Sequence, residues 1–203
     1  MSTRIRKKAH EMRKVPSQER SRATVEAIVD AATHVLGRRG WAKFTTNEVA
    51  GVAGASIGSL YQYFPNKLSL IEAIRRRHFD GVIAVLEEAC AEPGESSVDC
   101  LIQGMLRIHN SNPSLHKALL EDAPRFRTGS AMHEKFEKEY LEGYYRFVSK
   151  HVSGRKAVSH RVIAQVLAGA VEGTVHYAAT HGFSQVPTFK REIASMVRSY
   201  LSD

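Results

Sequence analysis

The chain has 203 residues, of which 43% are apolar and 25% charged, with a formal net charge of +8. This length suffices for one large or two small domains with a real core. No segment approaches about 18 uninterrupted apolar residues and the basic N-terminus lacks an apolar signal-peptide core, so the sequence predicts a soluble, cytoplasmic protein without a membrane partner.

The charge is distributed unevenly along the chain. Residues 1–79 hold 15 Lys and Arg against 6 Asp and Glu, a net charge of +9, whereas residues 80–203 hold 14 against 15, a net charge of −1. A basic region followed by a neutral one favours a polyanion such as nucleic acid as the partner of the first region. Cys90 and Cys100 match neither a CxxC pair nor a zinc spacing, so we expect reduced thiols and no cofactor.

The first 20 residues carry seven Lys and Arg and few apolar side chains, which is typical of a flexible basic arm. Such an arm can contact phosphates or enter a minor groove. From Ser21 to Arg39, apolar residues recur at helical spacing, which predicts a first helix. Trp41 and Phe44 follow it and are expected to fill the core between this helix and the next ones.

The next stretch reads FTTNEVAGVAGASIGSLYQYFPNK and predicts two short helices joined by a tight turn. Thr45 and Glu48 have the spacing of a capping box. Gly54 supplies the permissive backbone that ends a helix, and Ser56 can cap the next one. Pro65 ends that second helix because it lacks an amide and restricts the preceding residue. Two short helices with a glycine turn have the dimensions of a helix-turn-helix.

These motifs also carry a family resemblance. The T-x-x-E-V-A start, the A-G-A-S turn, the G-S-L-Y-x-Y-F helix and the following N-K-x-x-L occur in this order without a gap. The stretch of residues 20–80 therefore resembles the DNA-binding domain of the tetracycline-repressor (TetR) family of transcriptional regulators. The resemblance implies a homodimer that binds a DNA operator and responds to a small-molecule effector.

The second short helix is the expected recognition helix. Its N-terminal end would approach base edges, where small residues such as Gly58 permit close docking, and Gln62 can hydrogen-bond to adenine. The resemblance implies further contacts, with Tyr63 on a phosphate, while Tyr61 could instead be a buried ring. The full set of expected DNA-binding residues is Thr45, Thr46, Ser56, Ile57, Gly58, Ser59, Tyr61, Gln62, Tyr63 and Lys67.

The remaining chain predicts only helices, which makes the fold all-α with about nine helices. Asn66 can cap a connecting helix over 67–91, ended by a Pro-Gly pair. Arg75, Arg76 and Arg77 point in three directions around it, so we expect most of them to be solvated. Further helical patterns cover about 97–110, 113–122, 130–152, 158–181 and 188–202. We expect an arm at 1–20, a helix-turn-helix domain at 21–66 and an effector-binding and dimerisation domain at 67–203.

The pattern at 158–181 is unusual because it contains two glycines four residues apart on one face. An interior glycine costs about 1 kcal/mol relative to alanine, which close approach of another helix can offset. That helix could belong to the same subunit, but the resemblance favours a dimer interface built from the last two helices. The expected interface residues are Val162, Val166, Gly169, Gly173, Ile193 and Val197.

The effector would lie among aromatic and polar residues of the second domain, although aromatic stripes on helices more often form core. The candidate residues are Met105, His109, Phe126, Tyr140, Tyr144, Phe147, Glu172 and His176. The sequence does not identify the effector.

Two other readings are less consistent with the sequence. Residues 54–58, GASIG, match the G-x-S-x-G elbow of hydrolases, but that elbow needs a strand before the serine, where a capped helix is expected here. None of the ten histidines has the spacing of a helical zinc site. We therefore expect a repressor with neither catalytic nor metal-binding residues. The alternatives are a DNA-binding protein without small-molecule control and, more remotely, a hydrolase.

Overall fold

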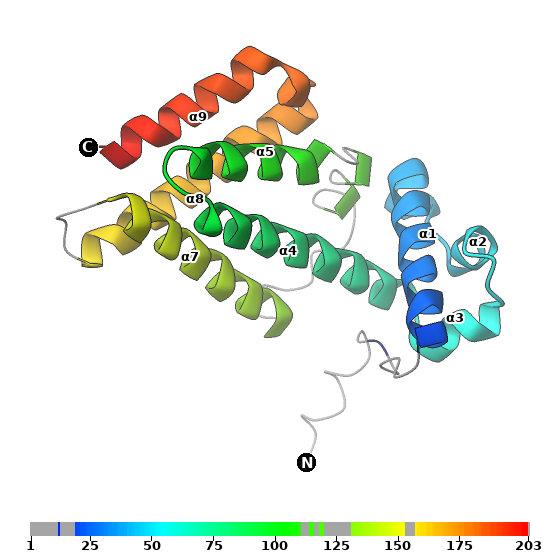
Figure 1. The fold of residues 1–203 in the computed structure, drawn as a ribbon. Helices are drawn as coiled ribbons and strands as arrows, with labels where there is room; N and C mark the ends of the chain where they lie inside the picture. The colour runs from blue at the N-terminus through cyan, green and yellow to red at the C-terminus, as the bar shows by residue number, and fades with distance from the viewer. Residues whose placement is uncertain are drawn as a thin grey trace. The chain divides into compact units, whose positions relative to one another are not determined.

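The computed structural model describes residue 12 and residues 19–110, 114–115, 118–119, 131–152 and 157–202. Within these ranges the chain forms eight α-helices, one short 3-10 helix and no strand, which confirms the all-α expectation (Figure 1). The helices predicted at 97–110, 130–152, 158–181 and 188–202 all form, while most of the segment at 113–122 lies outside the described residues. No helix in the described part of the chain is long and apolar enough to cross a membrane.

The chain divides into two compact units. The first comprises Met1–Arg77 and Ser114–Arg125, and the second comprises His78–Pro113 and Phe126–Asp203. The division falls inside the long helix α4 (Lys67–Ala91), so this helix contributes residues to both units.

The first unit contains α1 (Glu19–Lys43), α2 (Thr46–Val52) and α3 (Ile57–Tyr63). The apolar stripe of α1 is buried against them, as its helical spacing predicts. Gly40 interrupts α1 with φ 68° and ψ 170°, a backbone conformation that favours glycine. Beyond this break the rings of Trp41 and Phe44 stack with their centroids 6.1 Å apart, and Phe44 is fully buried, as expected of a core residue.

Helix α4 begins at the cap predicted from the sequence. The Ser69 amide donates to Asn66 Oδ1 at 3.0 Å, and the Ser69 hydroxyl donates to the Asn66 carbonyl at 2.6 Å. At about 1.5 Å per residue, its 25 residues give a rod of about 37 Å. Its apolar residues are divided between two cores: Leu70, Ile71 and Ile74 belong to the first, and Val82, Val85, Leu86 and Ala89 to the second.

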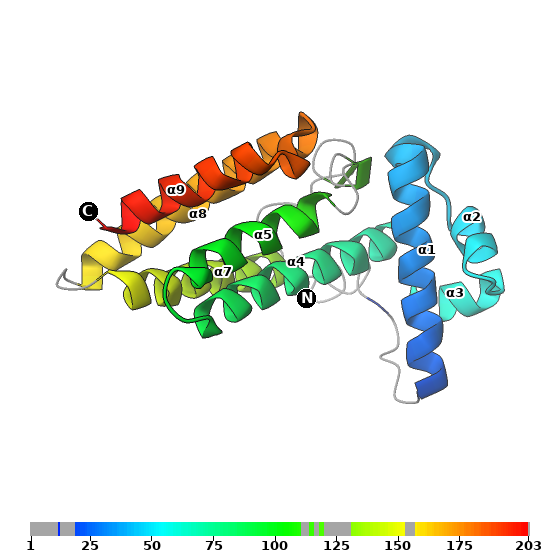
Figure 2. The same cartoon turned by 45° about the horizontal axis from the view of Figure 1, so that its top comes forward.

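The second unit adds α5 (Ser96–Asn110), α7 (Ala131–His151), α8 (Ala157–Thr180), η2 (Phe183–Gln185) and α9 (Pro187–Ser202). Figure 2 shows α8 and α9 running side by side, joined through η2. Glycines permit two close helix contacts with α4: a Cβ on Gly104 would lie 2.6 Å from Val85 Cγ1, and one on Gly143 would lie 3.0 Å from Leu86 Cδ1. These contacts bring α5 and α7 against α4.

Candidate DNA-binding surface and ligand-binding cluster

Helix α2 and the turn after it follow the local signals of the sequence. The Glu48 amide donates to Thr45 Oγ1 at 3.3 Å, which forms the predicted cap. The Glu48 carboxylate, however, accepts a hydrogen bond from Arg39 Nε at 2.9 Å and so connects α2 to α1. Gly54 has φ 63°, and the following Ala55 amide donates to the Ala50 carbonyl at 3.0 Å. The turn therefore redirects the chain abruptly from α2 into α3.

Helix α3 presents one face to solvent and one to the core. The Ser59 amide donates to Ser56 Oγ at 3.0 Å, which confirms Ser56 as the cap. Leu60 and Phe64 are fully buried, as expected. The exposed face begins at the N-terminal end of the helix and comprises Ser56, Ile57, Gly58, Tyr61 and Gln62, with Ser59 half-buried beside them.

The two tyrosines of α3 differ in their exposure. Tyr61 is 41% exposed, and its hydroxyl lies 3.0 Å from Thr46 Oγ1, so two of the expected DNA-binding residues contact each other across α2 and α3. Tyr63 is only 8% exposed and packs in the core of the first unit. The ring of Tyr63 therefore stabilises the fold and Tyr61 is the more exposed phenol, while a phosphate contact through the Tyr63 hydroxyl stays a prediction.

Lys67 stands at the first position of α4 with its ammonium 4.0 Å from the centroid of the Trp41 ring. A lysine in the first turn is repelled by the positive end of the helix dipole. An anion near this helix end would be stabilised by both the lysine and the dipole. The cation–π contact holds the lysine over the indole. Trp41, to which the sequence assigned only a core role, is half-buried and also positions this cation.

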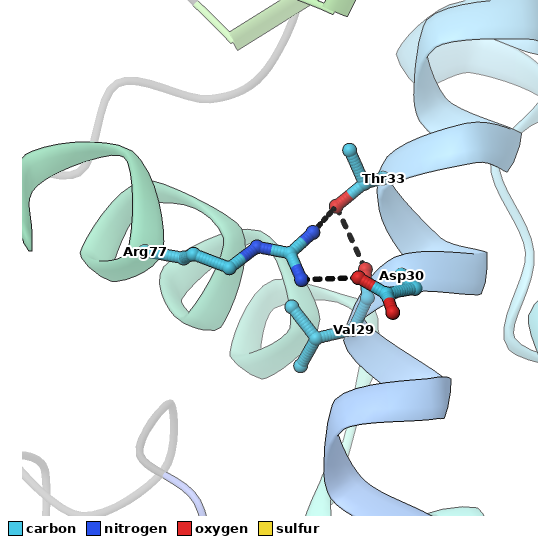
Figure 3. A network of polar contacts seen from close by, with 4 residues as sticks. All are labelled: Val29, Asp30, Thr33 and Arg77. Atoms are coloured by element: carbon cyan, nitrogen blue, oxygen red, sulfur yellow. Dashed lines mark hydrogen bonds and ion pairs between the residues drawn. The ribbon is translucent and has the colours of Figure 1, made fainter. Parts of the chain in front are cut away.

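A polar network that the sequence did not predict joins α4 to α1 (Figure 3). Arg77 Nη1 donates to Asp30 Oδ1, and Arg77 Nη2 donates to Thr33 Oγ1 at 2.7 Å. The Thr33 hydroxyl in turn donates to the Val29 carbonyl at 2.7 Å. Arg75 Nη2 donates to the carbonyl of Leu119 at 3.2 Å, and burial lowers the pKa of its guanidinium. Two of the three arginines expected to be solvated therefore bind within the first unit.

The residues expected at a dimer interface fall into two groups. Val162 and Val166 on α8 are 55% and 51% exposed, and a Cβ built on Gly169 or Gly173 would meet nothing within 4 Å in the described part of the chain. Packing against the described residues of the subunit therefore does not account for these glycines. Tyr177, which continues the same stripe, and Met196 on α9 are also exposed and were missed.

Ile193 and Val197 do not lie on that surface. Their exposed fractions are 4% and 0%, and both belong to the core of the second unit. The expectation that they form a dimer interface is wrong, because α9 directs this apolar face toward its own subunit. The periodicity of α9 identified an apolar face correctly but not what that face contacts.

Aromatic and histidine side chains gather inside the second unit. The ring of His109 lies 5.3 Å from that of His78 and 4.9 Å from that of His176, measured between centroids. The ring of Tyr140 lies edge-on to that of Tyr144 at 5.0 Å. Phe136 stacks on Phe79 at 3.8 Å and lies 5.4 Å from Tyr140. We call these seven residues the His–Tyr cluster; the sequence-based set contained four of them and missed His78, Phe79 and Phe136.

The titratable groups of the His–Tyr cluster are neutral near pH 7. Burial, with a smaller effect of His176, lowers the pKa of His78 to about 4, and burial likewise lowers the pKa of His109 to about 4. Burial also lowers the pKa of His176, opposed by Glu172, and raises the pKa values of Tyr140 and Tyr144. His109 Nδ1 donates to the Met105 carbonyl at 2.7 Å, which fixes the proton of the neutral ring on that nitrogen.

The other expected effector-binding residues are distributed around this cluster. Met105 and Phe147 are buried in the core of the second unit, Glu172 is exposed on α8, and Phe126 lies outside the described residues. The hydroxyl of Tyr144 is buried and interacts with the phenol of Tyr140, but it makes no hydrogen bond of normal geometry within the described ranges. A buried polar group of this kind is a natural partner for a ligand.

No group of three or more His, Cys, Asp or Glu in the described part of the chain is arranged to hold a metal ion.

These features define a class of protein: a helix-turn-helix DNA-binding protein with a second, helical unit that contains a buried polar and aromatic cluster. Two family models match the chain: "Bacterial regulatory proteins, tetR family" over residues 28–74, and "Tetracyclin repressor-like, C-terminal domain" over residues 93–201. The second match alone spans more than half of the chain. The protein belongs to the TetR family and is a transcriptional regulator of the helix-turn-helix type.

Individual relatives are distant. The HTH-type transcriptional regulator TtgR of Pseudomonas putida is 28% identical over 125 residues, which cover 60% of this chain and 54% of TtgR. The chain thus spans about half the length of this curated relative. Among solved structures, FadR of Bacillus subtilis in complex with stearoyl-CoA has a TM-score of 0.67 at 17% identity, covering 87% of this chain and 97% of that one. SmeT is a repressor from Stenotrophomonas maltophilia. Its complex with triclosan has a TM-score of 0.63 at 21% identity, and the match covers 89% of this chain and 90% of SmeT. These structural similarities bear on the fold alone.

Proposed function

We propose that this protein is a ligand-responsive repressor that binds a near-palindromic duplex operator as a homodimer and is released by a small-molecule effector. The observation that carries the proposal is the exposed face of α3, which includes Gly58 at the N-terminal end of the helix and Gln62 one turn further on. A recognition helix contacts base edges through this end. Thr46, Tyr61 and Lys67 would contact the flanking phosphates, while the caps at Thr45 and Ser56 hold the two helices in place.

Dimerisation is supported by the open stripe of α8. Val162, Val166 and Tyr177 are large apolar side chains left exposed on one face, and the two glycines between them allow another helix to approach closely. A second copy of the chain would cover this surface. A dimer would present one α3 to each of two successive major grooves, about 34–36 Å apart.

Control by an effector is supported by the His–Tyr cluster. It offers neutral imidazoles, phenols and aromatic faces, a combination typical of sites for small organic ligands. Two structural neighbours carry organic ligands, stearoyl-CoA on FadR and triclosan on SmeT. The effector of this chain would contact Tyr140, Tyr144 and His176.

Helix α4 would couple the effector to DNA binding. Arg77 binds α1, and the next residue, His78, belongs to the His–Tyr cluster. A ligand that displaces His78 would therefore turn or shift the helix that carries Arg77. A coupling free energy of about 1–3 kcal/mol is typical of such control, and it acts equally in both directions.

The proposal is tested by selecting duplexes from a random pool with the full chain. A repressor should recover an inverted repeat, bind it far more tightly than random DNA, and elute as a dimer. Recovery of unrelated sequences with similar affinities would contradict it. Once a ligand is found, calorimetry with and without operator measures whether operator binding changes the affinity for the ligand. Equal ligand affinities in the two titrations would mean that the protein binds DNA without control by that small molecule.

A further inference from the structure

The second unit contains a hollow separate from the His–Tyr cluster. It has a volume of about 670 Å³ and lies where the C-terminal half of α5 faces η2 and the first turn of α9. Pockets for small molecules commonly have volumes of about 300–1,000 Å³. The hollow is lined by Gln103, Leu106, Arg107, Asn110, Ser184, Gln185 and Lys190.

Helix α5 separates this hollow from the His–Tyr cluster. Gln103, Leu106, Arg107 and Asn110 follow the spacing i, i+3, i+4, i+7 and so share one face of the helix. His109 of the cluster projects more than 100° away around the same helix, at about 100° per residue. The two sites therefore lie on different sides of α5, and the hollow needs an explanation of its own.

The lining has a distinct charge. Among the described residues of the lining, Arg107 from α5 and Lys190 from α9 are the two ionised ones, both positive, and none is Asp or Glu. This is not a consequence of a basic background, because residues 80–203 carry a net charge of −1. The amides of Gln103, Asn110 and Gln185 add hydrogen-bond donors around the two cations.

Both cations can reach a ligand. Arg107 lies 3.8 Å from Glu88, but the two side chains are 71% and 61% exposed, and such a long, exposed ion pair is weak. No ion pair to Lys190 is found within the described ranges. The Ser184 hydroxyl already donates to the Ala178 carbonyl, so it stabilises the wall of the hollow and is not a donor to the ligand. Buried Leu106 supplies apolar surface.

We propose that this hollow binds a small organic anion, with a phosphate or carboxylate group held between Arg107 and Lys190. The planar guanidinium of Arg107 can bind such a group with two hydrogen bonds, and the ammonium of Lys190 neutralises it from a second helix. The apolar part of the ligand would lie against Leu106. This site is independent of the operator and of the ligand of the His–Tyr cluster.

The test uses the full chain and three probes of similar size: phenyl phosphate, benzoate and uncharged benzyl alcohol. Amide resonances of the ¹⁵N-labelled protein are followed during titration. An anion site predicts saturable shifts confined to α5, η2 and the start of α9 for one or both anions. The preferred anion distinguishes phosphate from carboxylate recognition, and benzyl alcohol should give no saturation.

Paired variants separate this site from general attraction to a basic protein. Arg107→Gln with Lys190→Gln should weaken binding by at least about tenfold, since two charge-assisted contacts are lost. Arg191→Gln with Lys138→Gln removes the same charge from exposed positions outside the lining and should leave binding within about twofold. Unchanged melting temperatures show that each variant is folded.

Several results would overturn the proposal. Equal loss of binding in both double variants would mean general attraction to positive charge, and shifts confined to the basic N-terminus would mean adventitious binding there. Equal binding of benzyl alcohol would mean that the hollow does not select anions. The absence of saturation at millimolar concentrations of all three probes would mean that it is not a ligand site.

Discussion

Arg77 on α4 and Asp30 on α1 form an ion pair inside the DNA-binding unit, and Thr33, one turn along α1, accepts the second arm of the same guanidinium. The fork therefore connects α4 to two neighbouring positions of α1 within the first unit. The side chains of Arg77 and Asp30 are 46% and 69% exposed, so solvent screens their attraction. We infer that the pair contributes more to the orientation of α4 than to stability.

Arg77→Gln and Asp30→Asn should each change the free energy of unfolding little, with a coupling energy of about 0.2–1 kcal/mol in the double-mutant cycle. The operator affinity of the effector-free protein should change more than stability does. Urea denaturation and fluorescence anisotropy with operator DNA measure the two quantities. Exposed Arg76→Gln on the same helix is the matched control. A coupling energy well above this range with unchanged operator affinity would assign the pair a purely structural role.

Lys67 and Gln62 should have separable effects on DNA binding. Lys67→Ala removes the proposed phosphate contact, so it should weaken binding to all sequences and reduce the salt slope by about one. Gln62→Ala should instead change which bases are preferred, because its amide can read adenine. Anisotropy across a range of salt and a panel of substituted operators measures both effects. If Lys67→Ala leaves the affinity and the salt slope unchanged, the N-terminal end of α4 does not contact a DNA phosphate.

Gly58→Ala tests close docking of α3. A Cβ at this position would have Ser56 Oγ as its nearest neighbour, at an ordinary 3.8 Å, so the fold accommodates alanine. Alanine also favours the helix by up to about 1 kcal/mol. We therefore expect an equal or higher melting temperature together with weaker operator binding, because the methyl group meets the DNA. Unimpaired binding would place this end of α3 away from the bases.

Local chemistry made much of the fold predictable from the sequence. The caps at Thr45, Ser56 and Asn66 and the turn at Gly54 depend on residues within a few positions of one another, and each forms as predicted. Helix α4 begins and ends where the asparagine cap and the Pro-Gly pair place its ends. Such signals act through short-range hydrogen bonds and backbone sterics, so they can be read without knowledge of the tertiary structure.

Tertiary contacts explain what the sequence could not provide. Tyr61 and Tyr63 are both aromatic residues of one short helix, and only the packing around α3 decides which ring is buried. The partners of Arg75 and Arg77 lie 44 and 47 residues away along the chain. Helix α8 buries Leu167 while exposing Val166, so its composition alone could not separate the core face from a possible dimer face.

Substitutions on α8 and α9 should distinguish the exposed stripe from the core. Gly169→Leu should block close approach of a second copy and yield folded monomers with weak operator binding, because nothing within the described subunit opposes the new side chain. Ile193→Ala should instead destabilise the fold by about 2–5 kcal/mol, as expected for a buried isoleucine. Light scattering and urea denaturation separate the two outcomes. A monomeric unmutated protein would contradict the dimer proposal.

The stability of the second unit should decrease as the pH falls from about 6.5 towards 4. Burial holds the pKa values of His78 and His109 at about 4, whereas an unfolded histidine titrates near 6.5. The unfolded chain therefore binds more protons in this window, so the stabilisation is complete above about pH 6.5 and is lost as the pH falls. At about pH 5, each of the two histidines should lower the free energy of unfolding by roughly 2 kcal/mol relative to its value at about pH 7.5.

His109→Gln removes one of these titrating groups while keeping a polar side chain of similar reach. The loss of stability between about pH 7.5 and pH 5 should then be roughly 2 kcal/mol smaller than in the unmutated protein. Urea denaturation at the two pH values measures this difference. His34→Gln, at an exposed histidine of α1, should leave the pH dependence unchanged. If His109→Gln also leaves it unchanged, His109 is hydrated in solution, and the His–Tyr cluster is not the neutral, enclosed site on which the effector proposal depends.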